Sequence, residues 1–127
     1  MPTPDARADP TGEFPRTAIP VFRGRVSPVL DTCTRICLLG PDRKREIVTM
    51  TIPVKGISIF DRADEIKKLG VGVVICGAVS DGLYNLLKER YIDLVCGITG
   101  DIDEVIRAYR DGTLSQERFR MPGADPP

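Results

Sequence analysis

Two segments of the chain share one order of residue types, and this repeat constrains the fold more than any other feature. The first is VVICGAVSDGLYNLLKER, residues 73–90, and the second is IDLVCGITGDIDEVIRAYR, residues 92–110. Each has a predicted strand, a Cys-Gly pair, an aspartate five residues after the cysteine, and an amphipathic helical pattern. Continuous apolar strands joined through helices are typical of parallel strands buried on both faces, and right-handed crossovers make them neighbours. The repeat therefore predicts an α/β fold.

The rest of the periodicity predicts an antiparallel meander before the repeat. Its strand patterns cover residues 17–22, 34–39 and 46–54, with PDRK as the turn between the last two. The other predicted elements are strands at 71–76 and 92–96 and helices at 61–69, 80–90 and 101–110. The last helix is the best marked, because Asp101 and Glu104 fit a capping box and Gly112 suits the position after the helix.

The length of 127 residues predicts a single domain. Residues 1–16 are rich in Pro, Asp, Ala and Arg, so we expect a flexible leader. The domain is expected over residues 17–114. Residues 115–127 end in a stretch rich in proline and are expected to form a loosely ordered tail.

The charges balance, with 18 basic and 18 acidic residues, so the whole chain gives no electrostatic support for a nucleic-acid or membrane-surface partner. No apolar run is long enough for a membrane span, and the N-terminal residues lack the apolar region of a signal peptide. We therefore expect a cytoplasmic protein. Its four cysteines are then reduced thiols, and the absence of histidine and of a CxxC pattern argues against a zinc site.

The cysteines fall into two pairs with different expectations. Cys33 and Cys37 are four residues apart on one predicted strand, about 13 Å at the usual rise, and are interpreted as fillers that cannot bridge. Cys76 and Cys96 end neighbouring parallel strands at equivalent heights, so we expect them side by side, about 5 Å apart. Ordinary core thiols remain an alternative for both.

Ligands of open α/β sheets bind beyond the carboxyl ends of parallel strands, where three loops of this chain are expected to converge. These loops are Arg23 to Ser27, Gly77 to Ser80, and Gly97 to Gly100. Their glycines permit close approach, and helix N-termini at Ser80 and Asp101 are expected to offer free N–H groups to an anion. The candidate contact residues are Arg23, Gly24, Arg25, Ser27, Gly77, Ser80, Gly97, Thr99 and Gly100, with Cys76 and Cys96 as candidate metal ligands.

The residue sequences of four segments also resemble those of a known protein family. IPVFRGRVSPVLDTC, LGVGVVICGAVSDGL, VCGITGDIDEVIRAYRDG and the closing RFRMPG resemble the dinitrogenase iron-molybdenum cofactor biosynthesis family over residues 17–123. The resemblance implies an RNase H-like fold, with a mixed five-stranded sheet of order 3-2-1-4-5 and helices on both faces. It also implies a role in holding an iron-sulfur or iron-molybdenum cluster for transfer. The chain departs from the pattern in lacking histidine and in having Ala124 after the terminal Pro-Gly.

Three functions compete on these observations. The leading hypothesis is a carrier without catalytic activity that holds an iron-sulfur or iron-molybdenum cluster, because arginines and N–H groups neutralise an anion and thiolates bind iron. Its partners would be cofactor-assembly proteins or an apo-nitrogenase-like acceptor, with the carrier a monomer or homodimer. The alternative is a metal-free interaction or regulatory module. An enzyme of the RNase H type would need an acidic residue on the first strand, and TAIPVF has none.

Overall fold

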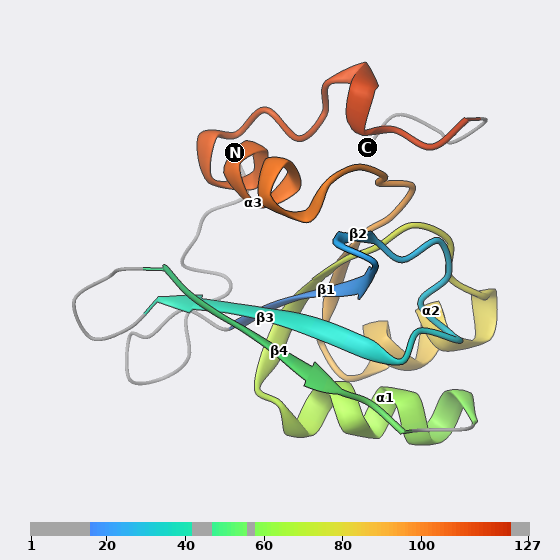
Figure 1. Ribbon diagram of the computed structural model, residues 1–127. Helices are drawn as coiled ribbons and strands as arrows, with labels where there is room; N and C mark the ends of the chain where they lie inside the picture. Colours follow the sequence, from blue (N-terminus) through green and yellow to red (C-terminus); the bar gives the residue numbers. More distant parts are fainter. Residues whose placement is uncertain (1–15, 42–46, 56–57, 123–127) are drawn as a thin grey trace.

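The computed structural model describes residues 16–41, 47–55 and 58–122 of the chain. They form an open, mixed sheet of six strands and three α-helices (Figure 1). The strands are β1 (Arg16–Phe22), β2 (Arg25–Val26), β3 (Arg35–Pro41), β4 (Ile47–Pro53), β5 (Val71–Ile75) and β6 (Asp93–Val95). The helices are α1 (Ile59–Lys68), α2 (Asp81–Glu89), α3 (Ile102–Asp111) and a 3-10 turn, η2 (Glu117–Phe119). The predicted α/β class is confirmed.

The long strands lie in the order β4-β3-β1-β5-β6. The pairs β1–β3 and β3–β4 are antiparallel, which confirms the predicted meander, and β1–β5 and β5–β6 are parallel. The sheet has six strands where we expected five, because the two-residue β2 folds back antiparallel on the end of β1. A positive φ at both Arg23 and Gly24 makes this turn. A two-residue strand is too short to leave a periodic pattern in the sequence.

The helices cover both faces of the sheet, with α1 and α2 on one face and α3 on the other (Figure 1). Alternation along the strands divides the core accordingly. In β1, Ala18 packs in the cluster with α1 and α2, whereas Ile19 packs in the cluster with α3. Both layers are therefore built from the near-continuous apolar strands that the sequence shows.

Side-chain caps set where the helices begin. The hydroxyl of Ser58 accepts a hydrogen bond from the backbone N of Asp61 at 3.1 Å, so α1 begins at Ile59, two residues before the predicted start. The predicted cap of α3 is confirmed, because the carboxylate of Asp101 accepts from the backbone N of Asp103 and of Glu104. Gly112 ends α3 in the left-handed conformation, as predicted.

The packed domain extends beyond both boundaries predicted from the sequence. Arg16 already belongs to β1. After residue 114, Phe119 is only 1% exposed and packs in the α3 cluster. Backbone hydrogen bonds from Thr99 N to Phe119 O and from Met121 N to Gly97 O tie this segment to the end of β6. The predicted leader up to residue 15, the last five residues, and most of the PDRK turn lie outside the described residues.

None of the helices in the described parts of the chain is both long enough and apolar enough to span a bilayer.

Candidate functional site

The three loops predicted to converge do meet at the carboxyl ends of the parallel strands. Gly97 N donates to Gly77 O at 2.9 Å, and Ala78 N donates to Pro28 O at 2.8 Å. Val26 N donates to Gly100 O at 2.9 Å, which joins the first loop to the third. The convergence therefore rests on backbone hydrogen bonds between loops that are far apart in the sequence.

Gly77 lies at the tightest point of this contact. A Cβ atom added there would lie 2.7 Å from the carbonyl oxygen of Pro28 and 3.1 Å from that of Ser27. Both neighbours are backbone atoms, which cannot rotate away as a side chain does. Glycine is therefore required at this position for the backbone after β2 to approach the loop after β5.

The backbone N–H groups of three candidate contact residues, Ser27, Gly97 and Thr99, are bonded within the protein. Ser27 is buried, and its N donates to Pro20 O at 2.7 Å. Thr99 N donates to Phe119 O at 2.7 Å, and Gly97 N is bonded to Gly77. These residues hold the loops in place, and their backbone donors serve the fold.

The N-termini of the two following helices were also expected to be open to an anion, and this expectation is wrong for both caps. Ser80 N and Oγ donate to the carboxylate of Asp31 at 2.8 and 2.5 Å. At α3, Asp101 is itself the capping residue, and its carboxylate accepts from the backbone N of Asp103 and of Glu104. Each helix N-terminus thus already has a negative group beside it, which the helix dipole stabilises. The sequence shows Asp31 only as a turn residue, because its partner is 49 positions away.

Cys76 and Cys96 lie side by side, as predicted. Their Sγ atoms are 3.9 Å apart, at the ends of β5 and β6. Cys76 is fully buried, at 0% exposure, and Cys96 is half-buried. The hydrogen bond from Cys76 to Cys96 raises the pKa of the Cys76 thiol, with burial adding to the rise, and it lowers the pKa of the Cys96 thiol. Within the described residues, no group of three or more His, Cys, Asp and Glu side chains is placed to hold one metal ion.

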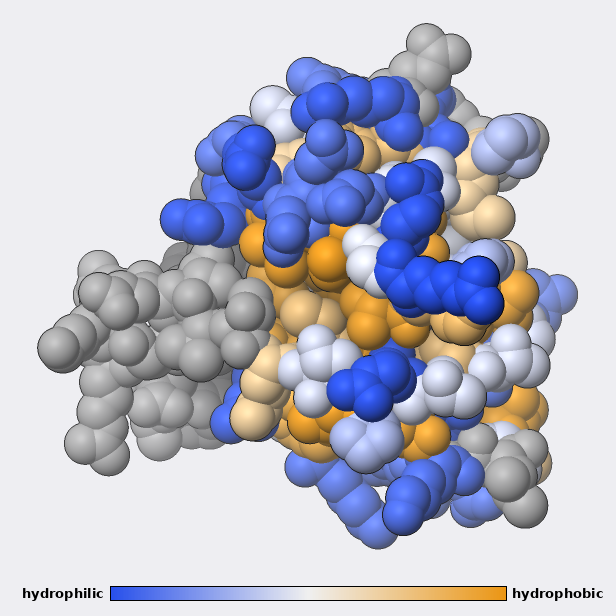
Figure 2. Space-filling view, viewed as in Figure 1, coloured by the Kyte–Doolittle hydropathy of each residue, from blue (hydrophilic) through white to orange (hydrophobic). Residues whose placement is uncertain are grey.

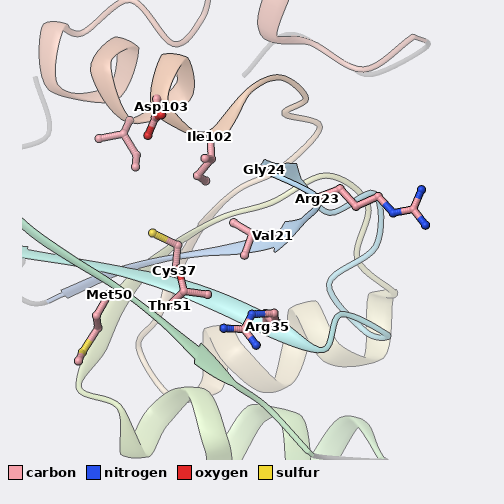
Figure 3. Close-up of a pocket in the computed structure, with 10 residues that line it drawn as sticks. Val21, Arg23, Gly24, Arg35, Cys37, Met50, Thr51, Ile102 and Asp103 are labelled. Carbon is pink, nitrogen blue, oxygen red and sulfur yellow. The ribbon is translucent and has the colours of Figure 1, made fainter.

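The candidate arginines lie in the β1–β2 turn and on β2, whereas the two thiols follow the ends of β5 and β6. Both thiols pack with the α1 and α2 cluster. The guanidinium of Arg23 lies over the Phe22 ring, 5.0 Å from its centroid, and Figure 3 shows it pointing outward from the end of β1. Arg25 is exposed on β2.

Cys33 and Cys37 lie on opposite faces of the sheet, and the prediction that they share a strand is wrong. β3 begins at Arg35, so Cys33 precedes it and packs in the α1 and α2 cluster. There, Nη1 of the buried Arg62 lies 3.6 Å from the Cys33 sulfur. Cys37 lies on β3 and packs on the α3 side.

Cys37 borders a cavity of about 460 Å³ that the sequence did not reveal. Figure 3 shows its sulfur directed toward α3, from which Ile102 and Asp103 point back toward the sheet. Apolar surface is visible in Figure 2 between the hydrophilic side chains of α3 and those of the strands below. The lining comes from β1, the β1–β2 turn, β3, β4 and α3, and consists of Val21, Arg23, Gly24, Arg35, Cys37, Met50, Thr51, Ile102, Asp103 and Ile106.

The cavity lies between α3 and the strands β1, β3 and β4, which supply its lining. The presence of such a cavity depends on where a helix lies on the face of a sheet, and residue periodicity does not predict that position. Burial raises the pKa of the Cys37 thiol, a hydrogen bond with Thr51 opposes the rise, and Asp103 adds to it. The cavity is therefore a second candidate site, with a mixed polar and apolar lining.

Comparisons with known proteins show where this fold recurs. No protein-family model matches the chain. An uncharacterized protein of Methanocaldococcus jannaschii is 25% identical over 107 residues, which cover 80% of this chain and 90% of that protein.

Solved structures give a closer likeness in shape than in sequence. A candidate dinitrogenase from Methanocaldococcus jannaschii has a TM-score of 0.63 at 20% identity, covering 78% of this chain and 90% of its own. A candidate NifB protein from Thermotoga, of the DUF35 family, has a TM-score of 0.58 at 18% identity, covering 79% and 90%. The apo form of the orange protein from Desulfovibrio gigas has a TM-score of 0.62 at 17% identity, covering 88% and 95%. The chain therefore has the fold of these proteins.

Proposed function

We propose that the protein is a carrier without catalytic activity that holds an iron-sulfur or iron-molybdenum cluster during nitrogenase-type cofactor assembly. The observation that carries the proposal is the 3.9 Å separation of the Cys76 and Cys96 sulfurs. Two thiolates bound to one tetrahedral metal at about 2.3 Å lie roughly 3.8 Å apart, so the pair has the spacing of a two-thiolate clamp. Iron in clusters is held by cysteine thiolates.

The fold likeness supports the cofactor-assembly part of the proposal. Proteins of the same fold are described as a candidate dinitrogenase and a candidate NifB protein. The RNase H-like description and the assembly role come from the motifs quoted above, and we carry them over as part of the proposal. In it, the protein acts in the cytoplasm, and its partners are cofactor-assembly proteins or an apo-nitrogenase-like acceptor.

The burial of the pair sets how cargo would be taken up. Cys96 is half-buried and is the thiol that an incoming cluster meets first. Cys76, behind it, has no exposed surface and becomes a ligand only when the loop after β5 moves. Two thiolates leave most positions of a four-iron cluster open. The cargo therefore brings its own ligands, or a second copy of the chain or an acceptor supplies them.

The test is anaerobic transfer of a preassembled cluster to the purified protein, followed by iron, molybdenum and sulfide quantification and electron paramagnetic resonance on the same sample. We expect stoichiometric metal in the wild-type protein and none in the Cys76→Ala/Cys96→Ala double variant. Cys37→Ala is the matched control, because it removes a buried thiol from the opposite face of the sheet. Circular dichroism checks that each variant is folded.

Retention of metal by the folded double variant would overturn this assignment of ligands. Loss of metal in Cys37→Ala but not in the double variant would move the cargo to the α3 cavity. Absence of metal from the wild-type protein after exposure to the cluster would overturn the carrier function itself.

A metal-free interaction or regulatory module is the second candidate. The observation that favours it is that three of the four thiols, Cys33, Cys37 and Cys76, are buried as ordinary core residues. This function predicts slow alkylation of those three thiols in the native protein, whether or not a cluster is offered. Protection of Cys96 from alkylation by an added cluster would argue against it.

A further inference from the structure

The geometry points to a reversible disulfide between Cys76 and Cys96, formed when a small hydroperoxide oxidises the pair. This modification depends only on the two thiols and their surroundings. It stands whether or not they hold a cluster, and only its consequence for cargo binding rests on the proposed function.

The backbone places both cysteines within reach of a disulfide. The register of β5 and β6 pairs Ile75 with Val95, and the next residues are the two cysteines. Cys76 N donates to Val95 O at 2.9 Å, and Ile98 N donates to Cys76 O at 3.0 Å, so this pairing continues past the strand ends. Neighbouring strands lie about 4.8 Å apart, which is inside the Cα separation of about 4.4–6.8 Å that disulfides span.

Closing the bond needs only a small movement. The sulfurs are 3.9 Å apart and already face each other. A disulfide bond is about 2.05 Å long, so the sulfurs must approach by somewhat less than 2 Å, which side-chain rotation provides. Both cysteines follow the last residues of their strands, so the hydrogen bonds between β5 and β6 need not break. Cys96 is also only half-buried, which leaves its side chain room to rotate.

The difference in burial gives the two thiols different roles. Cys96 is the accessible one, and its thiolate attacks one oxygen of the hydroperoxide. The O–O bond breaks, the second oxygen leaves as water or an alcohol after taking up a proton, and Cys96 becomes a sulfenic acid. Cys76 then attacks the Cys96 sulfur, the S–O bond breaks, and water leaves with the Cys76 proton. Both thiols are oxidised by two electrons in total, and one hydroperoxide is reduced.

The other two thiols compete poorly for this reaction. Cys37 lies on the opposite face of the sheet. Cys33 shares the face of Cys76, but its sulfur is buried against the Arg62 guanidinium. The expected disulfide is therefore specific to one pair, and in the proposed carrier it would remove both cluster ligands at once.

The experiment treats the metal-free, full-length protein with hydrogen peroxide at a small molar excess, then blocks the remaining thiols and digests the protein with trypsin. Each cysteine falls in its own tryptic peptide, at residues 26–35, 36–43, 69–88 and 91–107. We expect peptides 69–88 and 91–107 to be joined, free thiols to fall from four to two per chain, and reductant to reverse both changes. In Cys76→Ser, we expect the sulfenic acid at Cys96 to persist and react with dimedone.

The controls are Cys33→Ser and Cys37→Ser, in which the same crosslink should form. Joined peptides that contain Cys33 in the wild-type protein would overturn the proposal, and so would dimedone labelling of wild-type Cys96 without any crosslink. Because no metal is present, this result is separate from the cluster test. If the crosslink forms but no cluster binds, the two cysteines are a redox pair only, and the carrier function is wrong. If a cluster binds but no crosslink forms, they are a ligand pair only, and the disulfide proposal is wrong.

Discussion

The carboxylate of Asp31 binds both the backbone N and the hydroxyl of Ser80, and so joins the loop after β2 to the first turn of α2. The same hydroxyl accepts a hydrogen bond from Leu83 N at 3.2 Å, which caps the helix. One carboxylate therefore orients the capping side chain and also compensates the positive end of α2. It stands beside the loop that carries Cys76, so it also gives that loop a negative neighbour.

Replacing Asp31 by alanine should lower the free energy of unfolding by about 1–2 kcal/mol, because two hydrogen bonds and a favourable charge at a helix N-terminus are lost. Urea denaturation measures the change. A double-mutant cycle with Ser80→Ala should show coupling between the two residues. Strictly additive effects would mean that the two side chains do not interact in solution.

Gly77→Ala should destabilise the protein by about 1–3 kcal/mol, since the added methyl group meets the backbone carbonyls of Ser27 and Pro28. The matched control is Gly82→Ala in α2, where the new Cβ lies 2.9 Å from Cδ1 of Ile59, the mobile end of a side chain. Alanine also favours helix there by about 1 kcal/mol. Thermal unfolding of both variants compares the two losses of stability. Equal losses would show that the backbone around Gly77 shifts easily to make room for a methyl group.

Phe119→Ala should cost about 3–5 kcal/mol, because a fully buried aromatic ring is lost from the α3 cluster. The neighbouring Arg118→Ala is the control, since that exposed guanidinium only stacks on the ring, 4.5 Å from its centroid. Its cost should be no more than about 1 kcal/mol. Guanidinium denaturation measures both. A small effect of Phe119→Ala would mean that the segment after residue 114 does not contribute to the core.

The free energy of unfolding should fall as the pH rises above about 8.5, the pKa of an unfolded cysteine. Burial raises the pKa of Cys33 and of Cys37, so the native state keeps these protons after the unfolded chain has released them. Their stabilising contribution is complete below the unfolded pKa and decreases as pH rises toward the folded pKa, by at most about 1.4 kcal/mol per pH unit for each thiol.

Denaturation between pH 7 and pH 10 measures this slope. Cys33→Ala and Cys37→Ala should each make it shallower, and the double variant should combine the two effects because the residues lie on opposite faces. A slope that is identical in all four proteins would show that neither buried thiol is responsible.

Local residue patterns were enough to predict five of the six strands, the three α-helices and the parallel half of the sheet. The Cys-Gly repeat predicted two neighbouring parallel strands, and the structure confirms the adjacent pair of Cys76 and Cys96. The capping box at Asp101 and the terminal Gly112 predicted the bounds of α3 to within one residue. These features depend on residues close together in the sequence, where spacing and backbone geometry carry the information.

The sequence itself determined the α/β class, the glycine-rich loops and the thiol pair, because periodicity, capping and repeat spacing are local properties. Features that depend on contacts between distant residues could not be predicted from these local patterns. Only the tertiary structure decided that Asp31 binds Ser80, that Phe119 enters the core, that Cys37 borders a cavity, and that the Arg23 guanidinium lies over the Phe22 ring. Each of these features depends on how α3 and the loops pack against the sheet. This packing brings together side chains that are far apart in the sequence and follow no regular spacing.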